Sequence, residues 1–418
     1  MPVDLSRRAF TRTLQMAALL PLTSAAGSTK PENAFHVRTI TAGLNMQNIA
    51  DIDQAEAAVA FLHEARDTVA AEGHQVQTLR LATQPLQQYL PDWMNPAAIE
   101  AIQALDQFAV EKDVSFSIGP VITGDLYHEE FARWAVELIK STSNISFTVS
   151  IASPDLGIHP QSLRSAAEAM LAIANGTPGG EGNFRFAANA FTPPGTPFFP
   201  ASYFATGKTF SIGLESPNLL RHAFEGSDDF ADAATRLKTA MEAALIPVER
   251  LGDKLAADFQ WDYLGIDTSP APGLDASIGQ AIETLTGVPF GNASTLSACA
   301  AITDVLKNLA VKTCGYSGLM LPVMEDPVLA RRAAEGRYTL AQLLSYSSVC
   351  GTGLDVVPIP GDTPADTVTA ILADVASLAN KYQKPLSARL FPVPGKQVGE
   401  TVSFDNPYLT DSVVMAPG

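Results

Sequence analysis

From residue 36 onward, short apolar runs rich in Val, Ile, Phe and Thr alternate with longer stretches in which apolar residues recur every three or four positions. The short runs are typical of β-strands, and the long stretches are typical of amphipathic helices. The repeated order of strand and helix predicts a mostly parallel sheet with helical cover. The ten predicted strands lie at residues 36–44, 76–83, 114–121, 145–152, 184–191, 209–215, 258–266, 318–323, 354–359 and 386–393.

The region after residue 36 reads as one unit. It contains no Ser/Gly-rich linker, and its only long breaks, at 177–183 and 191–200, are predicted to be loops. We therefore predict a single α/β domain over residues 36–418, a closed or nearly closed ten-stranded α/β barrel with helices outside. Ligands of parallel α/β folds bind at the carboxyl ends of the strands, so the polar residues that follow each strand are the candidate site residues.

The first 27 residues have the pattern of a cleaved export signal. The basic segment SRRAFTR at 6–12 precedes a short apolar run and the small residues at 24–26. Arg7, Arg8 and Phe10 are similar to a twin-arginine signal, although Thr11 and Arg12 replace the usual Leu and Lys. The sequence predicts export by the twin-arginine machinery through residues 6–12 and a soluble periplasmic protein; the alternative is an ordinary N-terminal helix.

The charge balance narrows the range of partners. The chain has 27 Lys and Arg against 44 Asp and Glu, a net charge of −17, which disfavours binding to nucleic acid and to anionic membranes. No stretch after the signal reaches 18 consecutive apolar residues, so no transmembrane segment is predicted. Three cysteines, Cys299, Cys314 and Cys350, allow at most one disulfide among them.

Three segments join an apolar strand to a carboxylate and then to a predicted helix start: 261–279, 315–330 and 349–365. If their strand ends meet at one barrel mouth, the carboxylates form a catalytic site; the alternative is that each one caps the helix that follows. The candidate catalytic residues are Asp267, Glu325, Asp326, Asp355, Asp362 and Cys350, and the candidate substrate-binding residues are Asn45, Glu215 and Ser269.

Asp355 and Asp362 lie seven residues apart, at opposite ends of the strand predicted at 354–359. This spacing places Asp362 at the mouth and Asp355 toward the interior of the barrel. Cys350 has no assignable base or redox partner, which favours a buried structural thiol. The six histidines form no H-x-H or H-x-x-x-H pair, which disfavours a zinc site, whereas carboxylates at strand ends are compatible with a divalent cation of the Mg²⁺ or Ca²⁺ type.

These segments also resemble domain-of-unknown-function family 711. The shared patterns are G-[GY]-x-x-x-x-x-P-V-x-E-D at 315–326, D-x-S-x-A-P at 267–272, G-L-D-x-x-x-x-x-G-D-T-P at 353–364 and R-L-x-P-V-P-G-K-x-V-G at 389–399. The resemblance implies a ten-stranded barrel similar to that of pyruvate formate-lyase and the catalytic subunit of ribonucleotide reductase. It also favours Asp355 and Asp362 over Cys350, because the acidic motifs are usual in the family and the cysteine is not.

Those two enzymes use a cysteine thiyl radical, but this chain has no adjacent cysteine pair, and its C-terminus does not resemble a glycyl-radical loop. The sequence therefore predicts non-radical chemistry. Our leading hypothesis is a carboxylate-based enzyme of hydrolase or lyase type, acting on a small polar substrate, with or without a divalent metal. The second hypothesis is a non-catalytic periplasmic protein that binds a small ligand or serves as a scaffold.

Overall fold

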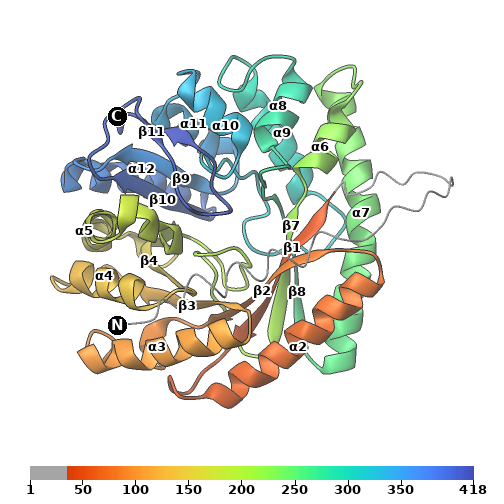
Figure 1. Ribbon diagram of the computed structural model, residues 1–418. Helices are drawn as coiled ribbons and strands as arrows, with labels where there is room; N and C mark the ends of the chain where they lie inside the picture. Colours follow the sequence, from red (N-terminus) through yellow and green to blue (C-terminus); the bar gives the residue numbers. More distant parts are fainter. Residues whose placement is uncertain (1–34) are drawn as a thin grey trace. The chain divides into compact units, whose positions relative to one another are not determined.

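The computed structural model describes residues 35–418 (Figure 1). The predicted export signal at residues 1–27 lies outside the described residues, so export and a periplasmic location stay predictions. The strands are β1 (His36–Leu44), β2 (Val76–Thr83), β3 (Ser115–Ile122), β4 (Ile145–Ser153), β5 (Gly157–Ile158), β6 (Phe186–Ala190), β7 (Thr209–Glu215), β8 (Asp262–Pro270), β9 (Gly353–Pro360), β10 (Leu386–Val393), β11 (Thr401–Val402) and β12 (Ser412–Val413).

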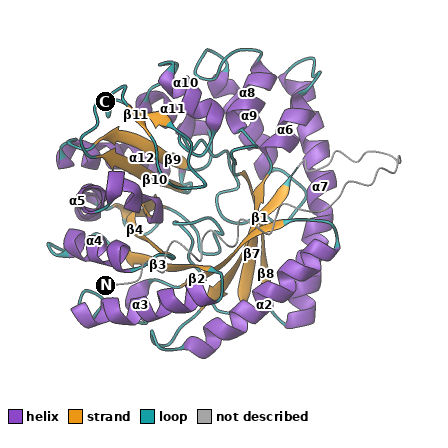
Figure 2. Cartoon of the chain, in the orientation of Figure 1, coloured by secondary structure: helices purple, strands orange, loops and turns teal. Residues whose placement is uncertain are grey.

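Helices surround the strands in the described part of the chain (Figure 2). Their ends follow local sequence signals: Asn95 caps α3 by accepting a hydrogen bond from the Ala97 amide, and Thr339 with Gln342 forms a capping box at α11. The helices are α2 (Ile52–Ala71), α3 (Pro96–Glu111), α4 (Phe131–Ser141), α5 (Pro160–Gly176), α6 (Pro217–Phe224), α7 (Phe230–Phe259), α8 (Ile278–Thr286), α9 (Thr295–Lys307), α10 (Pro327–Ala334), α11 (Leu340–Val349) and α12 (Ala365–Tyr382).

The strands form one large, mostly parallel sheet of ten strands, in the order β8-β7-β1-β2-β3-β4-β6-β10-β9, with the two-residue β5 paired to β4. Nine of the ten predicted strands are present at nearly the predicted positions. The described residues also form one compact unit. No helix in residues 35–418 is both long and apolar enough to cross a membrane.

The strands run in two opposed groups. β1, β2, β3, β4 and β6 are parallel to one another, but β7 pairs antiparallel with β1, and β10 pairs antiparallel with β6. β8 follows the direction of β7, and β9 that of β10. The expectation that all strand ends meet at one mouth is therefore wrong, because the carboxyl ends of the two groups lie at opposite edges of the sheet.

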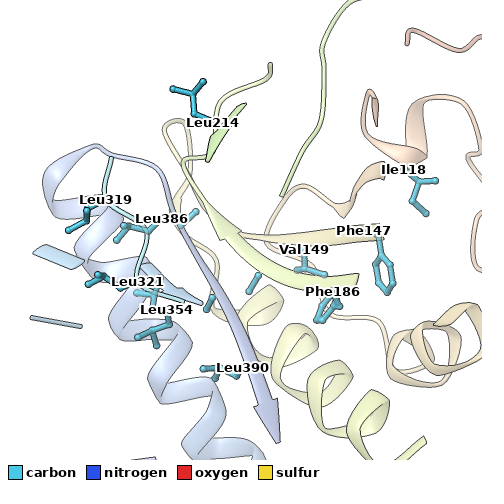
Figure 3. Close-up of a cluster of buried hydrophobic side chains, with 14 of the residues drawn as sticks. Ile118, Phe147, Val149, Phe186, Leu214, Leu319, Leu321, Leu354, Leu386 and Leu390 are labelled. Atoms are coloured by element: carbon cyan, nitrogen blue, oxygen red, sulfur yellow. The ribbon is translucent and has the colours of Figure 1, made fainter. Parts of the chain in front are cut away.

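One face of the sheet packs against the helices through apolar side chains. The core includes Ile40, Phe147, Phe186 and Leu390, each inaccessible to solvent. Figure 3 shows part of this cluster, with labelled side chains from β4, β6 and β10 and from the irregular residues Leu319 and Leu321. Alternate residues on each strand thus bury a continuous apolar layer beneath the helices.

The other face of the sheet carries mainly small polar side chains. They alternate with the core residues along each strand and are also buried. Two segments cover this face: the proline-rich loop 191–208, whose Ser202 carbonyl accepts a hydrogen bond from the Ser117 hydroxyl, and the C-terminal residues around Val402 and Val414, which pack on Phe391. The small polar residues are Thr39, Thr41, Ser117, Ser146, Thr148, Asn189, Thr209 and Ser211.

The predicted strand at 318–323 is irregular instead. Asp267 accepts hydrogen bonds from the amides of Tyr316 and Ser317, the hydroxyl of Ser269 accepts one from the Gly318 amide, and Pro322 has no N–H to donate. Side chains thus take the backbone donors of residues 316–318, at and just before the start of the predicted strand.

This irregular segment lies between the two end strands of the sheet. Pro322 within it makes an isolated bridge to Asp355 on β9, and Thr313, five residues before it, makes one to Ile266 on β8. The ladder of strands is not closed, so the structure does not confirm the predicted barrel or its similarity to pyruvate formate-lyase.

Candidate functional site

Six charged side chains gather on the polar face of the sheet, three arginines and three carboxylates. They come from five strands and from the end of the irregular segment, so positions far apart in the sequence meet there. Their mutual electrostatic influence and ion pairs place them in one neighbourhood. We call this group the arginine–carboxylate cluster: Arg38 (β1), Arg80 (β2), Glu215 (β7), Glu325 (after the irregular segment), Asp355 (β9) and Arg389 (β10).

Arg389 holds two of the carboxylates. Its Nε donates to Asp355 Oδ1 at 2.7 Å, and its Nη2 donates to Glu325 Oε1 at 2.6 Å. Its guanidinium carbon lies 5.0 Å from the centre of the Phe184 ring, which covers one face of the guanidinium. The side chain of Arg389 is 7% exposed, against 12% for Glu325 and 19% for Asp355. The two carboxylates therefore keep more accessible surface than the arginine that joins them.

Arg38 and Glu215 form a second buried ion pair, in which Arg38 Nη1 donates to Glu215 Oε2. Gln77 Nε2 also donates to this carboxylate oxygen, at 3.3 Å. The close approach of Gly273 leaves room for the carboxylate, because a Cβ there would lie 3.0 Å from Glu215 Oε1. Glu215 is thus bound to protein donors on β1 and β2.

Backbone irregularities in the strands accompany both ion pairs. The register between β1 and β7 shifts at Arg38, and the register between β9 and β10 shifts where Asp355 and Val356 together oppose Arg389. Val356 has φ of +43°, a rare conformation for a β-branched residue, and it is fully buried. Such bulges re-aim side chains, and strained backbone of this kind is concentrated at functional sites.

The surroundings of Glu325 displace its proton affinity. Burial raises its pKa above the usual glutamate value; Arg389 opposes this effect, and the negative charge of Asp355 adds to it. Two neighbouring carboxylates in different environments can divide the roles of proton donor and proton acceptor.

Asp267 and Ser269, both predicted site residues, hold backbone in place. Asp267 Oδ1 accepts from the Ser269 hydroxyl at 2.6 Å and from the Ser317 amide at 2.9 Å, and its Oδ2 accepts from the Tyr316 amide at 2.8 Å. The Ser269 hydroxyl in turn accepts from Gly318 N at 3.0 Å. These contacts fix the irregular segment that leads to Glu325.

We expect Asp267→Asn to lower the free energy of unfolding by about 2 kcal/mol. The amide nitrogen of asparagine, a donor, would replace a carboxylate oxygen that accepts from a backbone N–H, so two donors would face each other. Urea unfolding followed by circular dichroism would measure the change. Asp262→Asn is the matched control, since Asp262 is exposed on the same strand. Equal stability of the two variants would contradict the proposed backbone role of Asp267.

Asp326 acts as a helix cap. Its Oδ1 accepts from the amides of Val328 and Leu329 at the start of α10 and from the Ser277 hydroxyl, and its Oδ2 accepts from the Gly279 amide. These contacts fit the alternative that the sequence left open, a carboxylate that caps a helix.

Two other predicted residues lie apart from the cluster. Asp362 is exposed after β9, and its Oδ2 accepts a 3.4 Å hydrogen bond from Gln397. Asn45 follows the last residue of β1, whereas Arg38 lies near the start of that strand; seven strand residues span about 23 Å. The predicted residues are thus divided between the arginine–carboxylate cluster and positions outside it, in place of the single mouth expected from the sequence.

The three cysteines are free thiols. Cys350 follows α11 and is 1% exposed, and Cys299 lies in the same apolar core. Burial raises the pKa of both thiols, so the reactive thiolate is disfavoured. The carbonyl of Cys350 accepts a hydrogen bond from Lys384 Nζ at 2.6 Å, a contact that helps to hold the end of α11.

Within residues 35–418, no group of three or more His, Cys, Asp or Glu side chains is arranged to hold a metal ion. Glu325 and Asp355 both face the guanidinium of Arg389. Of the other acidic residues that suggested a Mg²⁺ or Ca²⁺ site, Asp267 and Asp326 accept hydrogen bonds from backbone amides, and Asp362 is exposed and accepts from Gln397.

Sequence reasoning missed Arg38, Arg80 and Asn189. The sequence did contain a sign of the two arginines' role, because the chain has few basic residues and each arginine stands within a predicted strand of mostly apolar and hydroxyl residues. Arg38 lies in VRTITAGL and Arg80 in TLRLAT. Asn189 is 3% exposed, and its Oδ1 has no hydrogen-bond partner within the described chain. Asn189 lies on β6 and pairs with Ser387 on β10. Ser387 is two residues before Arg389, so all three residues lie on the same face of the sheet.

Comparison with known proteins identifies the family to which the chain is similar. A family model described as "Uncharacterised ACR (DUF711)" matches residues 31–406, which confirms the resemblance seen in the motifs. A UPF0210 protein of Pyrobaculum arsenaticum is 32% identical over 378 residues, covering 85% of this chain and 82% of the relative. UPF0210 proteins of Actinobacillus pleuropneumoniae and Neisseria gonorrhoeae are each 26% identical over 398 residues, covering 88% of both chains.

Proposed function

We propose a function for this chain, which belongs to the uncharacterised DUF711 family, from its arginine–carboxylate cluster: it is an enzyme that performs acid–base chemistry on a small polar molecule. One observation carries the proposal. Glu325 and Asp355 share the guanidinium of Arg389 on a polar face, and both keep accessible surface.

The two carboxylates differ in a way that suits opposite roles. The raised pKa of Glu325 favours its protonated form, which can donate a proton to a leaving oxygen. Asp355, paired with Arg389 Nε, would accept a proton from the substrate or from an attacking water. One proton leaves Glu325 and one reaches Asp355 in each turnover, and exchange with solvent restores both groups. Hydrolysis and elimination both fit this arrangement.

The proposal can be tested with a mixture of compounds, before any substrate is identified. Purified protein would be incubated with a defined mixture of hydroxy acids, amino acids, phosphorylated sugars and nucleosides, and depletion would be followed by mass spectrometry. We expect the wild type to consume at least one compound and the double variant Glu325→Gln, Asp355→Asn to consume none. Equal depletion by both proteins would place the chemistry elsewhere. A compound that raises the melting temperature but is recovered unchanged would favour the non-catalytic binding alternative.

A further inference from the structure

Arg80 differs from the other two arginines of the cluster in its partners. It lies on β2, paired in register with Thr41 on β1 and Ser115 on β3, on the polar face. Its Nη1 donates to the carbonyl of Pro197 at 3.4 Å, and its guanidinium carbon lies 4.9 Å from the centre of the Phe199 ring. These two contacts anchor the guanidinium against the loop 191–208.

The positive charge of Arg80 has no adjacent carboxylate. Arg38 is paired with Glu215, and Arg389 with Glu325 and Asp355, but Arg80 forms no ion pair within the described part of the chain. Burial, and next the charge of Arg38, lower the pKa of Arg80 to about 9. The group is still charged at neutral pH, in a place where burial and a neighbouring arginine both act against its charge.

The chemistry of the guanidinium indicates what would compensate that charge. A guanidinium carries five N–H donors in one plane, and the only hydrogen bond from the guanidinium of Arg80 to the described residues is the long one to Pro197. Phe199 covers a face of the group and leaves in-plane donors for another acceptor. Carboxylate and phosphate groups match such a planar fork with two parallel hydrogen bonds.

We propose that Arg80 binds an oxyanion of the ligand, a carboxylate or a phosphate group, within the arginine–carboxylate cluster. The inference rests on the site of the proposed function and narrows its substrates to small anionic molecules. The oxyanion would lie against Arg80, and the reacting part of the molecule would extend toward Glu325, whose charge influences Arg80.

The test uses inorganic phosphate and acetate as probes, with potassium chloride at equal ionic strength as the salt control. Melting temperature and isothermal titration would be measured for the wild type, Arg80→Gln and Arg133→Gln. Arg133 is the control because its side chain is 79% exposed, in a surface pair with Glu130. We expect phosphate, acetate or both to bind the wild type, and the probe that binds more tightly identifies the anion class.

Arg80→Gln is expected to weaken this binding about 10- to 100-fold, because two charge-assisted hydrogen bonds are lost, while Arg133→Gln binds as the wild type does. Arg80→Lys keeps the positive charge but lacks the planar fork of donors, so it should also weaken binding. This second variant serves as the test if Arg80→Gln does not fold. The proposal is overturned if neither probe binds the wild type, or if the Arg80 variants bind as tightly as it does.

This outcome is separable from that of the proposed function. Depletion of a compound by the wild type with unchanged anion binding in the Arg80 variants would reject only the oxyanion site. Binding of phosphate or acetate through Arg80 without depletion of any compound would reject only the enzymatic activity.

Discussion

Replacing Arg389 with methionine is expected to lower the free energy of unfolding by about 3–5 kcal/mol, because Glu325 and Asp355, which are largely buried, would lose the cation that neutralises them. Methionine keeps an unbranched apolar chain over the length of the arginine stem, so the packing of the stem is retained, whereas the stacking of the guanidinium on Phe184 is lost with the charge. The effect should therefore report lost charge compensation more than lost volume. Urea unfolding at neutral pH would measure it, with Arg133→Met as the exposed control.

Two further measurements separate charge from packing. Arg389 lowers the pKa of Glu325, so its removal raises that pKa further above the unfolded value. The folded variant then binds more protons than its unfolded chain, and its deficit relative to the wild type should shrink as the pH falls toward about 4.3, the ordinary glutamate pKa. Adding Glu325→Gln and Asp355→Asn should recover part of the lost stability at neutral pH. A deficit below about 1 kcal/mol would show that the buried network contributes little.

The positions of the strands could be predicted from the sequence, but their directions could not. Alternation of apolar residues marks where a strand lies and which face it buries, and it is the same whichever way the strand runs. A clue existed between β6 and β7, because residues 191–208 contain no helical pattern, whereas a parallel connection normally needs a crossover helix. The proline-rich loop instead accompanies a reversal of strand direction relative to the first group.

That reversal changes where the chemistry can lie. With all strands parallel, Asn45, Asp267 and Asp362 would share one edge of the sheet. With two opposed groups, the start of β1 lies beside the end of β7, so Arg38 meets Glu215, a pairing that no local pattern indicates. Three of the predicted acidic residues, Glu215, Glu325 and Asp355, still belong to the cluster, because each forms an ion pair with Arg38 or Arg389.

Long-range partners also decide which acidic residues are available for chemistry. In the sequence, Asp267, Asp326 and Asp355 look alike, each close to an apolar run and a Gly or Pro. In the fold, backbone donors from residues 277–329 surround the first two, whereas Asp355 faces Arg389. Apart from the local cap that Asp326 forms with Val328 and Leu329, the difference depends on contacts between residues 34 to 50 positions apart, which composition and periodicity do not contain.

Glu325→Gln is expected to lower the turnover of the depleted compound about 10²- to 10⁴-fold, the range usual for the loss of a general acid. Its amide oxygen can still accept from Arg389 Nη2, so the fold and the affinity for the compound should change little. In the wild type, turnover should fall as the pH rises through the raised pKa of Glu325, because only the protonated carboxyl can donate.

The pH dependence distinguishes a catalytic role from a structural one. In Glu325→Gln the residual turnover should lose this decline at higher pH, since the amide does not titrate, whereas a merely destabilised enzyme would keep the profile of the wild type at reduced amplitude. Glu335→Gln, ten residues further on at the exposed end of α10, is the matched control and should match the wild type in rate and profile. A rate within twofold of the wild type for Glu325→Gln would remove Glu325 from the mechanism and leave Asp355 as the only acid–base group held by Arg389.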